Sequence, residues 1–152
     1  MVPVSRRIPA RGIRGVVALL AVLALGACAN PLGGRSDTSR QWLRWRDQRI
    51  TDYTFRYARQ CFCQDYGTLV VEVRDGVVTH VHSEQGIPVA QPDVHVPTVD
   101  ELFARIIVAE REGTHTDVDY HDSRAYPTDA TIGTLENDAG VRHVISDLRR
   151  ID

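Results

Sequence analysis

Several features are missing from this chain of 152 residues, and each absence excludes a class of protein. No serine lies in a nucleophile-elbow context and no glycine-rich stretch forms a phosphate loop, so hydrolases and nucleotide-binding proteins of those types are excluded. The acidic residues near Asp100 and Glu110 belong to a predicted helix surface, which argues against a two-carboxylate hydrolase. Lysine is also absent, since all 18 basic residues are arginine. We derive no function from that bias.

The chain also lacks an apolar run long enough for a transmembrane helix. Its main apolar run, 16–27, is shorter than the roughly 20 residues that cross a bilayer. It follows four arginines without any acidic residue and ends in Gly26 and Ala27, directly before Cys28. A charged, then apolar, then small-residue order is typical of export signals. The pattern resembles a bacterial lipoprotein signal, which implies cleavage before Cys28, a diacylglyceryl group on its sulfur and acylation of the new amino terminus. We therefore expect residues 1–27 to be removed.

Two other interpretations of the N-terminus remain open. Ordinary secretion would leave Cys28 as a lone exposed thiol near the terminus. Ser5, Arg6 and Arg7 invite a twin-arginine export signal, but Pro9 stands where such signals usually carry a bulky apolar residue. The lipoprotein interpretation is favoured, and it places the protein at a cell membrane or outer membrane, lipid-anchored, with its domain outside the cytoplasm.

The expected mature chain divides into a tether and one domain. Residues 28–38 are rich in turn formers and read as a lipidated N-terminus with a flexible tether. Residues 39–152 have a length suited to a single domain. Removal of residues 1–27 would take the formal net charge from −2 to −6, because four arginines are lost. An acidic surface repels phosphate backbones, so we expect no nucleic-acid partner.

Two helices are predicted. Ser39 is a candidate N-cap for the first, which is expected to end near Ile50 and to turn three apolar residues inward, Trp42, Leu43 and Trp45. Thr98 and Glu101 form a capping box for the second, and Gly113 is its expected C-terminal cap. Apolar residues recur along the second helix with helical spacing.

Six strands are predicted from alternating apolar residues and turn signals, over 53–63, 69–74, 77–83, 116–120, 128–136 and 141–148. The element order is helix and three strands, twice. We therefore predict an α+β domain in which two helices cover one face of an antiparallel sheet of about six strands. The order is compatible with a tandem αβββ repeat.

The hairpin about Asp75 and Gly76 has two alternative registers. A three-residue loop with a bulge would pair Val73 with Val77 and bury Val77 and Thr79, leaving His80 and His82 in water. A two-residue turn would shift the register by one and turn both histidines toward the core. Burying unpaired imidazoles is costly, so the first alternative is favoured.

Six short motifs lie along the mature chain: Tyr53-Thr54-Phe55, Cys61-Phe62-Cys63, Val73-Arg74-Asp75-Gly76-Val77-Val78, Thr98-Val99-Asp100-Glu101-Leu102-Phe103, Tyr120-His121 and Ala125-Tyr126-Pro127. As a set they resemble an uncharacterised family of bacterial lipoproteins built on a domain of unknown function. His121 stands where that family has an acid, and Ala125 where it has a glycine. The resemblance covers most of the mature chain and implies no particular activity.

Cys61 and Cys63 are a candidate disulfide, because lipidation of Cys28 would leave an even pair in an oxidising compartment. In a regular strand their Cα atoms would stand near or beyond the upper limit of roughly 6.8 Å for a disulfide, so a bridge requires the strand to bend. A small ring of this kind would be easily reduced, which opens a thiol-redox hypothesis. In the alternative, the two cysteines have no redox function: a disulfide or two reduced thiols only mark the end of the strand.

A second candidate site alternates along one predicted strand, where His115, Asp117, Asp119 and His121 would share a face. Imidazoles and carboxylates suit zinc or another transition metal. One strand alone does not wrap a metal, since side chains two apart stand roughly 7 Å from each other. These residues are therefore weak metal candidates, stronger if His80 and His82 face them from a neighbouring strand. The alternative is a solvated strand face.

The sequence thus favours a non-enzymatic envelope lipoprotein whose domain binds an unidentified envelope protein or ligand, with no cofactor and no catalytic residue expected. The alternative is a thiol-redox or metal-dependent envelope enzyme that uses the cysteine pair or the His/Asp strand face. A purely structural role in envelope assembly is a third hypothesis.

Overall fold

The computed structural model describes residues 37–63, 66–89, 95–137 and 139–151. The elements in chain order are α2 (Asp37–Asp47), β1 (Tyr53–Gln60), β2 (Leu69–Arg74), β3 (Val77–Ser83), α3 (Val99–Glu112), β4 (Thr116–Tyr120), β5 (Pro127–Ile132), the 3-10 turn η2 (Leu135–Asn137) and β6 (Val141–Arg150). All described pairings between strands are antiparallel, in the order β3-β2-β1-β6-β5-β4.

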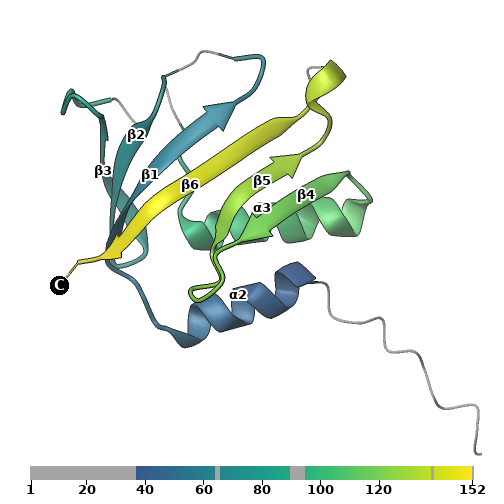
Figure 1. Ribbon diagram of the computed structural model, residues 1–152, viewed down its shortest axis with the longest axis horizontal. Helices are drawn as coiled ribbons and strands as arrows, with labels where there is room; N and C mark the ends of the chain where they lie inside the picture. The colour runs from purple at the N-terminus through teal and green to yellow at the C-terminus, as the bar shows by residue number, and fades with distance from the viewer. Residues whose placement is uncertain (1–36, 64–65, 90–94, 138, 152) are drawn as a thin grey trace, which may run out of the picture. The chain divides into compact units, whose positions relative to one another are not determined.

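Both helices lie on one side of this sheet, with α3 against β4 and β5 and α2 against α3 (Figure 1). Each half of the domain supplies a helix and three consecutive strands, and β1 and β6 join the halves at the centre. The predicted fold class is confirmed. A duplication as the origin of this order stays a prediction.

The first helix begins at Asp37, so the prediction that Ser39 is its N-cap is wrong. The cause is a tertiary contact of Thr38, which is buried: its hydroxyl donates to the Glu110 carboxylate of α3 and accepts from the Tyr120 hydroxyl of β4 at 2.7 Å. These bonds hold the N-terminal turn of α2 in place. The helix ends at Asp47 rather than near Ile50.

Aromatic side chains fill the core beneath the helices. Trp45 is buried, packs edge-on against Tyr53 and Tyr126, and donates its indole N–H to Asp100 at 3.2 Å. The inward-facing residues of β1 continue this layer as Tyr53, Phe55 and Tyr57. Leu43 is exposed, so its predicted inward position is wrong. The face of α2 that packs against the core is therefore narrower than the prediction from Trp42, Leu43 and Trp45 implied.

The β2–β3 hairpin has a two-residue turn, so the favoured three-residue loop is wrong. Asp75 and Gly76 have φ values of 50° and 74°, as a type I′ turn requires, and Arg74 pairs with Val77. The register then shifts between Val73 and Glu72, so that Glu72 pairs with His80.

This bulge leaves Thr79 as an extra residue and restores the alternation beyond it. Val81 therefore faces the core, and His80 stays exposed. Val77 and Thr79, which were expected to be buried, are exposed as well.

The second helix follows its predicted caps. Thr98 Oγ1 accepts from the Glu101 N–H at 3.2 Å, and Glu101 Oε2 accepts from the Thr98 N–H at 2.9 Å. Gly113 ends the helix with a φ of 74°. The inward face of this helix is fully buried at Val99, Leu102, Phe103 and Ile106.

The later strands follow the predictions in part. The β4 bounds are confirmed, whereas β5 ends at Ile132 instead of continuing to Glu136. Gly133 turns the chain there with a φ of 84°, and its backbone lies against Ala139 and Gly140. Between β4 and β5, the buried Ala125 has a φ of 63°, in the left-handed region. That conformation explains why the resembling family usually has glycine at this position.

Replacement Thr98→Ala is expected to lower the free energy of unfolding by about 1 kcal/mol, because the Glu101 N–H loses its acceptor at the start of α3. Urea denaturation measures the change. Thr134→Ala, at an exposed position outside the helices, is the control and is expected to have no effect. Equal stability of the Thr98→Ala variant and the wild type would contradict a stabilising capping box.

Candidate functional site

An open groove lies between α3 and the β5–β6 end of the sheet. Its volume is about 570 Å³, within the range of small-molecule sites. The walls are mostly apolar and come from three elements and the turn before β6: Ala104, Val108, Ala109, Ile132, Ala139 and Val141. The α3 wall contains two alanines, whose short side chains leave space that larger residues would fill. The polar residues that also line the groove are Arg105, Glu112, Thr114 and His143.

His143, whose end of the groove we call the floor, belongs to a buried polar pair with Tyr57, which lies behind it and does not line the groove. His143 on β6 is only 4% exposed and Tyr57 on β1 only 1%. The Tyr57 hydroxyl lies 2.8 Å from His143 Nδ1, a hydrogen bond between strands that are adjacent in the sheet. Arg59 pairs in register with His143, and Arg105 reaches the groove from α3. Arginines from two different elements therefore act on the imidazole.

Burial sets the protonation state of this pair. Burial lowers the pKa of His143 to about 4, and the charges of Arg105 and Arg59 act in the same direction. Burial raises the pKa of Tyr57 to about 12 against the smaller opposing effect of the same arginines. Both groups are thus neutral near pH 7. A general acid or base works best with a pKa near the working pH, so this pair suits hydrogen bonding better than proton transfer.

The cysteine pair forms a disulfide. The Cα atoms of Cys61 and Cys63 are 5.2 Å apart, because β1 ends at Gln60 and the chain bends through both cysteines. The predicted bridge is confirmed, and the prediction that the strand continues to Cys63 is wrong. The bridge lines a separate hollow of about 320 Å³ next to Arg59 and Gln60. It does not line the His143 groove.

The His/Asp strand face lies on the side of the sheet away from the helices. Val118 packs toward the core opposite the buried Ala130, so Asp117 and Asp119 point the other way. His115, Asp117 and Asp119 are exposed. Asp119 lies opposite Asp129, which already accepts hydrogen bonds from Arg142, with Nε 2.9 Å from Oδ1.

His121 lies beyond the end of β4 and does not share this face. Its Nδ1 accepts from the Arg124 N–H at 3.3 Å, and its ring lies against Tyr126 with centroids 4.9 Å apart. The side chain therefore shapes the turn between β4 and β5. Among the described residues, no three His, Cys, Asp or Glu side chains are grouped so as to hold a metal ion.

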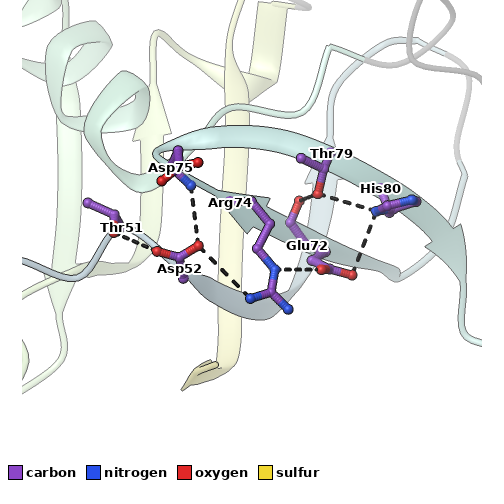
Figure 2. A network of polar contacts seen from close by, with 7 residues as sticks. All are labelled: Thr51, Asp52, Glu72, Arg74, Asp75, Thr79 and His80. Atoms are coloured by element: carbon purple, nitrogen blue, oxygen red, sulfur yellow. Dashed lines mark hydrogen bonds and ion pairs between the residues drawn. The ribbon is translucent and has the colours of Figure 1, made fainter. Parts of the chain in front are cut away.

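The condition that would have strengthened the metal hypothesis is not met: His80 and His82 do not face the His/Asp strand, because β3 and β4 are opposite edges of the sheet. Five strand spacings separate them, roughly 24 Å. His80 belongs instead to the surface network in Figure 2, drawn with Thr51, Asp52, Glu72, Arg74, Asp75 and Thr79.

In that network, Arg74 Nε donates to Glu72 Oε1 at 2.8 Å, and His80 Nδ1 lies 3.7 Å from Glu72 Oε2 (Figure 2). The hydrogen bond from Arg74 is the main cause that lowers the pKa of Glu72. Exposed ion pairs of this kind contribute little to stability. The network connects the two strands of the hairpin at the protein surface.

Sequence reasoning missed the groove. His143 alternates with the buried Ile145 along β6, which is a signal for an inward-facing imidazole. The alternating run of β1 indicates that Tyr57 is buried, but its partner is found only from the pairing of β1 with β6. Cys28 lies outside the described residues. No helix of the described part of the chain is long and apolar enough to cross a membrane.

Comparison with known proteins gives one match. Residues 37–150 match the model of a family described as a family of unknown function, DUF6174. This confirms the part of the sequence-based resemblance that concerns a domain of unknown function. Neither the curated proteins nor the solved structures gave a match.

The buried imidazole predicts a pH dependence of stability. His143 is neutral in both states above pH 6.5, its ordinary pKa. As the pH falls below that value, the unfolded chain binds a proton that the folded chain excludes until about pH 4. Its contribution to the free energy of unfolding, about 3 kcal/mol, is thus present above pH 6.5 and lost on the way to pH 4.

Urea denaturation at pH 7.5 and pH 4 tests this, with His143→Gln as the matched variant that does not titrate. The wild type is expected to lose about 3 kcal/mol more than the variant between the two pH values. Equal losses, or an NMR titration of His143 near pH 6.5, would contradict the prediction.

Proposed function

The chain belongs to the family of unknown function DUF6174, and we propose that it is a lipid-anchored protein of the bacterial cell envelope whose domain binds a small ligand without transforming it. The ligand occupies the His143 groove. The observation that carries the proposal is a cavity of about 570 Å³ with mostly apolar walls and, at its floor, His143, which is hydrogen-bonded to the buried Tyr57. Ligand sites commonly combine an apolar lining with a few placed polar groups.

The anchoring part of the proposal is supported by the N-terminal sequence. An arginine-containing segment, a short apolar run and small residues precede Cys28 in the order of a lipoprotein signal. The mature domain would then be held at a membrane surface by several acyl chains, which bind far more firmly than one. A ligand site with apolar walls is useful there, since amphipathic molecules concentrate at membranes.

The non-enzymatic part is supported by the protonation states in the groove. At pH 7 a proton acceptor with a pKa of about 4 and a proton donor with a pKa of about 12 are both weak. The alternatives named from sequence lie elsewhere: the Cys61–Cys63 bridge lines another hollow, and the His/Asp face is open to solvent. We therefore propose binding as the function of this groove.

Lipidation is tested by metabolic labelling in a bacterium that processes lipoproteins. Radiolabelled palmitate is expected to mark the wild type and not Cys28→Ser, while Cys61→Ser is the control that keeps the label. A wild-type protein without label, expressed at full level, would refute the anchor.

Ligand binding is tested with N-phenyl-1-naphthylamine, a neutral apolar dye whose fluorescence rises in apolar sites. Val108→Asp is expected to weaken its binding at least about tenfold, since the substitution places a charge in the groove wall. Val108 is 49% exposed, so the fold tolerates the change.

The matched control is Val77→Asp, at a position 62% exposed in the β2–β3 hairpin and away from the groove. It is expected to bind the dye like the wild type. No binding to the wild type, or equal weakening by both substitutions, would refute the groove as the ligand site.

A further inference from the structure

Building on the proposed function, we infer that the groove selects an apolar molecule that ends in a carboxylate, with the carboxylate held by His143 and Arg105. The argument combines the hydrogen-bonding character of the floor, the unbalanced positive charge beside it and the apolar walls beyond it.

The floor offers a donor. The Tyr57 hydroxyl has His143 Nδ1 as its one partner among the described residues. A buried O–H that donates to nothing is costly, so we assign this proton to the bond with Nδ1. A neutral imidazole that accepts at Nδ1 carries its own proton at Nε2. Nε2 therefore donates.

That donor is accessible from the groove. No hydrogen bond from Nε2 to any described residue is found, and the described part of the chain contains no fully buried side-chain nitrogen or oxygen without a partner. Nε2 must therefore keep some contact with open space, and His143 lines the groove. An N–H at the floor calls for a hydrogen-bond acceptor on the ligand.

The charge at this end of the groove is positive. Arg105 lines the groove, and Arg59, which lines the hollow beside the disulfide, pairs in register with His143 and acts on its ring. Neither guanidinium forms an ion pair with a described residue, whereas Arg142, on the other face of β6, is paired with Asp129. Guanidinium groups are donors only and match carboxylates well. The floor therefore favours an anion with acceptor oxygens.

The opposite charge that lines the groove is distant from this end. Glu112 lies seven residues after Arg105 on α3, two helical turns and roughly 10 Å along the axis. Between the two charges the wall is formed by Val108 and Ala109. An apolar body lies along this wall while its charged end meets Arg105, so a carboxylate with an apolar tail fits both features.

The test compares three probes with the same eight-carbon tail at pH 7: octanoate, octanamide and octylamine. Isothermal titration calorimetry with the full mature domain is expected to give octanoate at least about tenfold tighter binding than octanamide, and no binding of octylamine. Octanoate is also expected to raise the NMR-measured pKa of His143, which octanamide does not, because a nearby negative charge favours the protonated ring.

Arg105→Met keeps the apolar stem and removes the charge, so the preference for octanoate over octanamide is expected to fall toward one. Arg111→Met is the matched control on the same helix, outside the groove, and is expected to keep the preference. Binding of the naphthylamine dye together with equal affinities for octanoate and octanamide would overturn this inference and leave the proposed function standing. Absence of binding for the dye and all three probes would overturn both.

Discussion

The pairing of β1 with β6 is the constraint on which the domain depends. It joins the first and last strands at the centre of the sheet, with β2 and β3 on one side and β5 and β4 on the other. The same pairing sets Arg59 opposite His143 and brings the Tyr57 hydroxyl to an imidazole 86 residues away in sequence. The floor of the groove is therefore a product of non-local pairing, which forms at a large cost in chain entropy.

Local features of the fold follow from sequence because their causes are local. Thr98 and Glu101 satisfy each other's backbone N–H groups within one turn, so the start of α3 needs no tertiary information. The β4 bounds follow in the same way from an alternating run. The start of α2 does not, because Thr38 is held there by Glu110 and Tyr120, which are distant in sequence.

The β2–β3 hairpin shows why the remaining features escaped prediction. A two-residue turn followed by regular pairing would turn both histidines toward the core. In this hairpin the turn at Asp75 and Gly76 sets one register, and the bulge at Thr79 shifts it by one residue for Val81 and His80. A single inserted residue costs little and has no clear sequence signature. The candidate site was not predicted for a related reason. Tyr57 and His143 are ordinary strand residues in the sequence, and only the pairing of β1 with β6 brings them together.

The proposed ligand would give a role to the polar pair next to the groove. In a purely structural core, Phe and Leu at these two positions would fill similar space without removing a hydroxyl and an imidazole from water. Tyr57 and His143 satisfy one hydrogen bond between themselves, which offsets part of that cost. His143 Nε2 forms no hydrogen bond with the described residues. Burial and the charges of Arg105 and Arg59 disfavour a protonated ring. A carboxylate in the groove would accept from that nitrogen and balance those charges, so the features that lower the stability of the domain are those that such a ligand would use.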